Sequence, residues 1–179
     1  MKSSSPYLPA AVFAVWLAIT GIVLIRLTIS HATALAPGSP AGHLAGTGAW
    51  RAIHVLSPTC GCSRRIAAYL TRRRALPDLH ETVWMADAEM PLSQALRESG
   101  FQTEIVTQAD LQSLYRMAGV PWLLFVRPDG RIAYSGGYQR PLDGRPNLYH
   151  DMEIWAALQR GADVPALPAF GCSTGKKVE

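Results

Sequence analysis

The stretch GVPWLLFVRPDGRIAYSGG, residues 119–137, carries the strongest structural signal in the sequence. Within it, residues 122–126 (WLLFV) form a continuous apolar run, which is typical of a central strand buried on both faces of a sheet. Pro128, Asp129 and Gly130 then provide a strong turn signal. Residues 131–135 (RIAYS) have the pattern of a second strand, so we expect the two strands to form a β-hairpin.

Strand and helix patterns alternate on both sides of this hairpin. Strand patterns occur earlier in the chain at residues 51–57 and 81–86. Helix patterns, with apolar residues three or four positions apart, occur at residues 61–74, 91–98 and 151–159. Residues 101–107 have an extended pattern, and Asp110 is expected to cap a helix that Gly119 closes. This order predicts an α/β fold with a mixed sheet and helices on both faces.

The composition is that of one ordinary domain with accessory segments. The chain has 179 residues, of which 49% are hydrophobic, and this is enough to build a core. The net charge is +4, but only 17% of the residues are charged, and the basic residues do not alternate with aromatic ones. We therefore expect no nucleic-acid partner.

An apolar run near the N-terminus predicts a membrane anchor. Residues 8–25 (LPAAVFAVWLAITGIVLI) are 18 positions without a charge, which is about the length that crosses a bilayer. Lys2 precedes the run, so the N-terminus is expected in the cytoplasm and the remainder of the chain outside. The alternative is a cleaved signal peptide, because residues 32–34 (ATA) and 34–36 (ALA) resemble cleavage sites. Both alternatives export the domain.

These patterns divide the chain into four parts. We expect an anchor or uncleaved signal at residues 1–30, a Pro/Gly/Ala-rich linker at 31–49 that does not pack, a folded domain at 50–161 and a C-terminal tail at 162–179. The predicted location is the cytoplasmic (inner) membrane, which the chain crosses once. The folded domain is expected on the extracytoplasmic, periplasmic side.

The three cysteines, Cys60, Cys62 and Cys172, are too few and odd in number for a disulfide scaffold, and they suit redox chemistry better. Cys60 lies at a predicted helix start, where unpaired N–H groups and the helix dipole favour a thiolate. Cys62 follows two positions later, and side chains two apart in a helix point about 160° from each other. A disulfide between them therefore requires Cys60 to lie outside the helix, with Gly61 supplying backbone freedom.

The region from about residue 51 to 159 resembles the thioredoxin superfamily, particularly its membrane-anchored extracytoplasmic members. The resemblance rests on residues 53–60 (IHVLSPTC), a strand that leads to a cysteine at a helix start, and on the Gly-Val-Pro sequence before the central strand. It implies a thioredoxin-like fold in which Cys60 is the nucleophile. It also implies that Pro121 is a cis-proline facing Cys60, and that Val120 offers its backbone to a bound substrate chain.

The chain departs from the family pattern at two positions. Ser63 stands where the second cysteine usually lies, and Cys62 falls one position earlier. His54 stands where thioredoxins have a buried acid. A neutral His54 imidazole could exchange the proton of the attacking thiol, and the alternative is a core histidine bonded to the backbone.

Two functions are compatible with these residues. The first is a thiol–disulfide oxidoreductase without a cofactor, in which Cys60 attacks disulfides of exported proteins and Cys62 or Cys172 resolves the mixed disulfide. A membrane protein that donates electrons is a further expected partner. Reduction, oxidation and isomerisation all fit these residues. The second function is a copper(I)-binding module for metal delivery, with Cys60, Cys62, Cys172 and His54 as ligands.

Overall fold

The computed structural model describes residues 7–32, 44–113, 115–117, 119–140 and 148–173 of the chain. It consists of two compact units, residues 1–33 and residues 34–179. The first unit contains a single helix, and the second contains a sheet with its covering helices.

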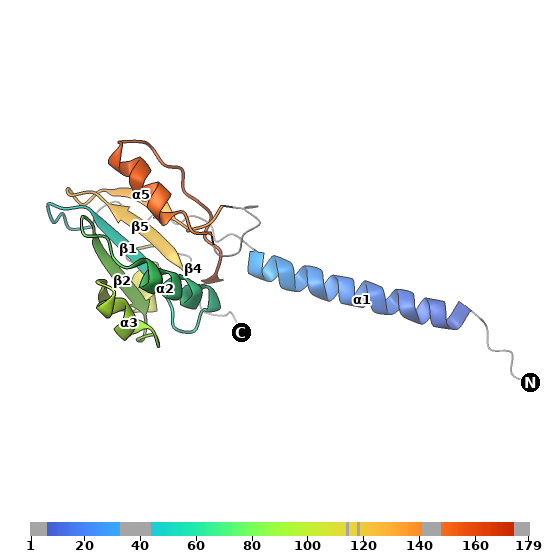
Figure 1. Ribbon diagram of the computed structural model, residues 1–179. Helices are drawn as coiled ribbons and strands as arrows, with labels where there is room; N and C mark the ends of the chain where they lie inside the picture. Colours follow the sequence, from blue (N-terminus) through green and yellow to red (C-terminus); the bar gives the residue numbers. More distant parts are fainter. Residues whose placement is uncertain (1–6, 33–43, 114, 118, 141–147, 174–179) are drawn as a thin grey trace, which may run out of the picture. The chain divides into compact units, whose positions relative to one another are not determined.

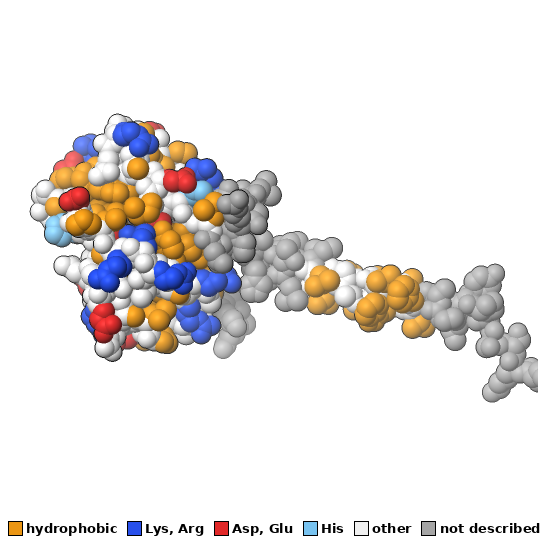
Figure 2. All heavy atoms as spheres, viewed as in Figure 1, with side chains coloured by type: hydrophobic (Ala, Val, Ile, Leu, Met, Phe, Trp, Pro, Cys, Tyr) orange, Lys and Arg blue, Asp and Glu red, His pale blue; other side chains and the backbone are white. Residues whose placement is uncertain are grey.

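The first unit is helix α1 (Tyr7–Ala32). Its described side chains, at residues 11–24, are mostly exposed, and large apolar groups such as Phe13, Trp16 and Ile22 are among them (Figure 2). Within the described residues, none of the helices combines the length and the apolar character that a membrane crossing needs. The anchor predicted over residues 8–25 therefore stays a prediction.

A five-stranded mixed sheet forms the centre of the second unit (Figure 1). Its strands lie in the order β3 (Gln102–Val106), β2 (His80–Ala86), β1 (Arg51–Leu56), β5 (Trp122–Val126) and β6 (Ile132–Gly136). The first three strands are parallel to one another, whereas β5 is antiparallel to both β1 and β6. The predicted hairpin is confirmed, and β1 lies in the middle of the sheet.

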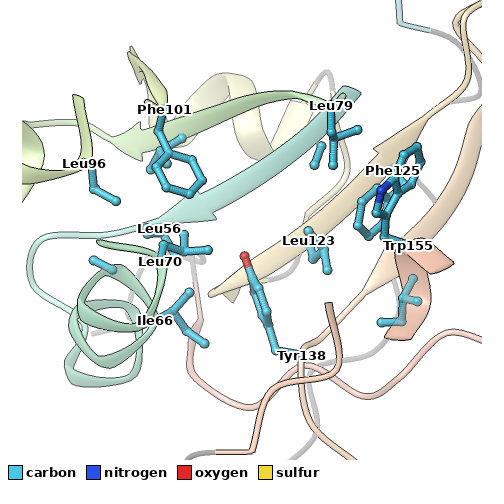
Figure 3. Packing of buried hydrophobic residues seen from close by; sticks show 14 of the residues in the cluster. Leu56, Ile66, Leu70, Leu79, Leu96, Phe101, Leu123, Phe125, Tyr138 and Trp155 are labelled. Carbon is cyan, nitrogen blue, oxygen red and sulfur yellow. The ribbon is translucent and has the colours of Figure 1, made fainter. Parts of the chain in front are cut away.

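Both faces of the sheet are buried, which explains the unbroken apolar run in β5. Leu123 and Phe125 point into one core, together with residues from α2 (Gly61–Arg73), α3 (Ser93–Glu98) and α5 (Asp151–Gln159) (Figure 3). Trp122, Leu124 and Val126 alternate with them and point into a second core on the opposite face, beneath α4 (Gln108–Ser113). The predicted α/β fold, a mixed sheet flanked by helices, is thus confirmed.

The helix predicted from Asp110 to Gly119 is wrong in its bounds. α4 begins at Gln108, because Thr107 rather than Asp110 caps it: the Thr107 hydroxyl oxygen accepts the Asp110 N–H at 3.0 Å. The helix ends at Ser113, and Gly119 belongs instead to the short strand β4 (Gly119–Val120). Because the helix is shorter than predicted, Gly119 and Val120 form a strand before β5.

Two segments that were expected to be loose are bonded to the folded unit. At the end of the predicted linker, the Leu44 N–H donates to Gly130 and the Gly48 N–H to Pro128, so this part packs on the β5–β6 turn. In the C-terminal tail, the two-residue strand β7 (Cys172–Ser173) pairs antiparallel with β4. The C-terminal tail therefore lies beside Gly119 and Val120, the residues that precede β5.

Candidate functional site

Cys60 stands at the junction of β1 and α2. Its backbone is extended (φ −93°, ψ 120°), which makes it the N-cap residue of α2. The Cys60 N–H donates to the Ser57 carbonyl at 3.2 Å, and the Arg64 N–H donates to the Cys60 carbonyl at 3.1 Å. Cys60 thus precedes the helix and lies beside the unpaired N–H groups of its first turn, where the helix dipole favours negative charge.

The surroundings of Cys60 lower the pKa of its thiol. The largest single effect is burial, which raises the pKa, because the side chain is fully buried. Hydrogen bonds to the thiol of Cys172 and to the N–H and hydroxyl of Ser63, together with the Cys172 backbone, favour the thiolate and outweigh burial. The pKa of Cys60 therefore lies below its ordinary value of 9.0, which increases the fraction present as nucleophile.

Ser63 belongs to this site although the sequence singled it out only as a departure from a family pattern. Its Oγ is buried, and apart from its interaction with the Cys60 thiol it has no hydrogen-bond partner within the described part of the chain. A thiolate at Cys60 would satisfy this hydroxyl. The signal was the i, i+3 spacing, which places Cys60 and Ser63 on the same side of the helix start.

The segment before β5 lies against the thiol. The Val120–Pro121 peptide bond is cis, and the Cys60 Sγ lies 3.7 Å from the Val120 carbonyl oxygen. Cys60, Val120 and Pro121, which are far apart in the sequence, therefore meet in one place. The meeting follows from the sheet, in which β1 and β5 are adjacent strands.

Cys172 is brought to the same place by the pairing of β7 with β4, in which it lies opposite Val120. Although its side chain is largely exposed, partial desolvation of the thiol, its hydrogen bond to Cys60 and the negative charge there raise its pKa to about 12. Cys172 therefore holds its proton and donates a hydrogen bond to Cys60. The three cysteines are free thiols in this structure.

Cys62 lies within the first turn of α2 and is half-buried. Its sulfur accepts a hydrogen bond from the Arg65 guanidinium at 3.3 Å. Arg65 is one of several exposed arginines in or next to α2, together with Arg64, Arg72 and Arg74. Their exposure places them on a solvated face of the helix.

His54 is engaged away from the thiols. Its Nδ1 is 2.8 Å from the Tyr138 hydroxyl and its Nε2 is 2.9 Å from Glu81 Oε2, so both ring nitrogens have partners. Its ring packs against Phe101, in the core on the α2 side of the sheet, whereas Cys60 belongs to the core on the other side. Among the described contacts none joins His54 to Cys60, so His54 lies outside the site around Cys60.

A buried ionic cluster surrounds His54. Arg73 donates to both carboxylate oxygens of Glu81, at 3.1 and 2.6 Å, and its Nε lies 3.1 Å from Asp151. Burial raises the pKa of Glu81, but hydrogen bonds and charges from His54 and Arg73 lower it to about 2. This cluster fixes the end of α2 against β2 and α5.

The copper hypothesis required His54 to join the cysteines. Within the described residues, no group of three or more histidine, cysteine or acidic side chains is gathered closely enough to hold a metal ion. The arrangement that is present, a buried thiol with a lowered pKa beside a second thiol that donates to it, is suited to sulfur exchange.

A pocket of about 170 Å³ borders this site. Its walls include Ser57, Pro58 and Thr59 from the turn before Cys60, together with Val120 and Cys172. The remainder of the lining comes from the loop after β2 and the start of α4, at Ala86, Asp87, Ala88 and Gln108. Sequence reasoning missed these lining residues, because no motif connects the three segments.

Comparisons with known proteins found similar structures but no similar sequence. No protein-family model and no curated protein matches the sequence. An uncharacterized conserved protein from Geobacillus kaustophilus has a similar structure, with a TM-score of 0.58 and 18% identity over 82% of this chain and 95% of its own. A hypothetical protein from Sinorhizobium meliloti is similar to the same degree, with a TM-score of 0.58 and 17% identity over 82% of this chain and 98% of its own.

A more distant likeness is to the thioredoxin domain of a thiol-disulfide oxidoreductase from Bacteroides vulgatus, with a TM-score of 0.43 and 19% identity over 68% of this chain and 98% of that one. This structural similarity is too low to support a conclusion about activity. The sheet order, the cysteine at the start of α2 and the cis bond before β5 are those of a thioredoxin-like fold, which the second unit adopts.

Proposed function

We propose that this protein is a thiol–disulfide oxidoreductase in which Cys60 is the nucleophile and Cys172 resolves the mixed disulfide. The observation that carries the proposal is the environment of Cys60. A buried thiol at a helix N-terminus has its pKa lowered by a neighbouring thiol and by Ser63. A lowered pKa increases the fraction of Cys60 present as thiolate, which is the species that attacks a disulfide.

The first step is the attack of the Cys60 thiolate on one sulfur of a partner disulfide. A new S–S bond forms between Cys60 and that sulfur, and the partner's other sulfur leaves as a thiolate that takes up a proton. In the second step the Cys172 thiolate attacks the Cys60 sulfur. A Cys60–Cys172 disulfide forms, the partner's remaining sulfur leaves as a thiol, and the partner has gained two electrons. The same steps in reverse oxidise a partner dithiol.

The first step prepares the second. While Cys60 is a thiolate, its charge and its hydrogen bond help to raise the pKa of Cys172 to about 12, after burial as the largest cause. Once Cys60 is in a mixed disulfide it carries no charge, so this contribution disappears and the pKa of Cys172 falls. Cys172 is thus a better nucleophile when there is a mixed disulfide to resolve.

The proposal includes a location and partners. We place the domain on the extracytoplasmic side of the cytoplasmic membrane, held there by the uncharged apolar run at residues 8–25. Its partners are then exported proteins with cysteines or disulfides, and a membrane protein that exchanges electrons with the Cys60–Cys172 pair.

Reduction of insulin by the full chain in detergent, with dithiothreitol as the electron source, tests the activity. We expect activity in the unmodified chain and in the matched variant Cys62→Ser, and its loss in Cys60→Ser. Equal activity in Cys60→Ser and in the unmodified chain would refute the proposal.

A further inference from the structure

The C-terminal tail occupies the backbone edge beside the reactive thiol. In the pairing of β7 with β4, Val120 faces Cys172 and Gly119 faces Ser173. Antiparallel pairing of this kind satisfies backbone N–H and C=O groups of both segments. The edge of β4 is therefore a site that accepts an extended peptide, and here the peptide is part of the same chain.

The fit at this edge selects the residue before the cysteine. A side chain at Gly171 would collide with the carbonyl oxygen of Val120, and it would approach the Pro121 ring to 2.6 Å. The backbone of the tail lies so close to β4 that only glycine fits at this position. The bound sequence is thus Gly-Cys, with the cysteine sulfur directed to Cys60.

The tail is also fastened upstream of β7. The Gly137 N–H donates to the Leu167 carbonyl at 2.8 Å, and a side chain at Gly136 would approach that carbonyl oxygen to 2.7 Å. Ala169 is buried in the core that contains Cys60. These contacts keep residues 167–169 attached even when β7 leaves its place, so β7 can depart and return as a short tethered strand.

We propose that the edge of β4 binds an extended Gly-Cys segment of the partner protein, and that β7 is a tethered stand-in for this segment. The inference rests on the proposed function, because the bound cysteine is the one whose sulfur Cys60 attacks. Two strands cannot pair with the same edge at once. The partner segment therefore displaces β7 before the first step, and the return of β7 brings Cys172 to the mixed disulfide and displaces the partner.

The inference identifies the substrate class as proteins that present a glycine directly before the reacting cysteine in an extended segment. Larger residues at that position collide with Val120 and Pro121 as a side chain at Gly171 would. The stand-in also accounts for the complete burial of Cys60 in the free protein. Disulfides without a glycine at that position replace β7 less readily and react more slowly with the thiol.

Peptides provide the first test. The probe is the chain's own sequence at residues 169–173 (AFGCS), with its cysteine in a disulfide to a coloured aromatic thiol, and the matched control peptide has valine in place of the glycine. We expect the full chain to release the coloured thiol at least about ten times faster from the glycine peptide, a difference of about 1.4 kcal/mol in activation free energy. Equal rates for the two peptides would overturn the inference.

A variant provides the second test, made in a Cys172→Ser background so that only the first step is observed. Gly171→Val forces β7 off the edge, so we expect Cys60 to react about tenfold faster with the glycine peptide. The matched control is Gly21→Val in α1, where a side chain meets nothing within 4 Å, and it should leave the rate unchanged. A Gly171→Val rate equal to that control contradicts the stand-in role. Undiminished release by Cys60→Ser would instead refute the proposed function itself.

Discussion

Replacement of Glu81 by glutamine tests the buried ionic cluster that fixes α2. Glu81 is 4% exposed, and its carboxylate accepts hydrogen bonds from Arg73, from His54 and from the Leu76 N–H at 2.7 Å. Its pKa is about 2 in the folded protein, against an ordinary value of 4.5. This difference corresponds to about 3 kcal/mol of folding free energy, because each factor of ten in proton affinity is worth about 1.4 kcal/mol.

The sign follows from the lowered pKa. A carboxylate that binds protons less tightly when folded stabilises the fold fully above its unfolded pKa of 4.5, and this stabilisation is lost as the pH falls toward 2. We therefore expect Glu81→Gln to lower the free energy of unfolding by about 3–5 kcal/mol near pH 6, since Arg73 then loses a buried partner. Near pH 3 the difference between the variant and the unmodified chain should be much smaller.

Urea unfolding followed by tryptophan fluorescence at both pH values measures these free energies. The matched control is Glu89→Gln, because Glu89 is 57% exposed in its ion pair with Arg97 and should contribute at most about 1 kcal/mol. If Glu81→Gln destabilises the protein equally at both pH values, the account of Glu81 as a carboxylate with a strongly lowered pKa is refuted.

Three further predictions concern the thiols and the core. Cys172→Ala removes a hydrogen-bond donor from Cys60, so the pH midpoint of Cys60 alkylation should rise, whereas Cys172→Ser keeps a hydroxyl donor and should raise it less. An unchanged midpoint in Cys172→Ala would contradict the role of Cys172 as a donor. Cys62 lies within α2 and takes no part in either proposed step. Mass spectrometry of oxidised Cys62→Ser should therefore still detect a Cys60–Cys172 disulfide. If this disulfide is absent, Cys62 is the resolving residue. Leu70→Ala, at a fully buried position of α2, should lower the free energy of unfolding by about 2–5 kcal/mol in urea, and a loss below about 1 kcal/mol would show that the core there is loosely packed.

The sequence contained most of the fold because the strongest signals are local. The run at residues 122–126 is apolar at every position, and the structure buries alternate residues in two cores, which is the physical reason for the pattern. The bounds of α5, Asp151–Gln159, are those that its apolar spacing predicted. Local patterns were weaker near α4, because both Thr107 and Asp110 can cap a helix. Thr107, which is nearer to β3, is the residue that caps α4.

The site was predicted less completely, because it is assembled from distant segments. Cys60 could be recognised from its place at a helix start. Cys172 was predicted as one of two possible resolving residues, but the pairing of β7 with β4 could not be predicted. It depends on the fit of Gly171 against Val120 and Pro121, which no local pattern encodes. His54 was predicted either to exchange protons with the thiol or to lie in the core bonded to the backbone. It is buried, but its partners are the side chains of Glu81 and Tyr138.

Trapping of the mixed disulfide tests the central claim most directly. The reduced full chain, the Cys172→Ser variant and the Cys60→Ser variant are mixed with a peptide disulfide, quenched with acid and mapped by mass spectrometry. The account predicts a lasting peptide adduct on Cys60 in Cys172→Ser, a Cys60–Cys172 disulfide in the unmodified chain, and no adduct in Cys60→Ser. An adduct formed on Cys62 or Cys172 while Cys60 stays unmodified would contradict it.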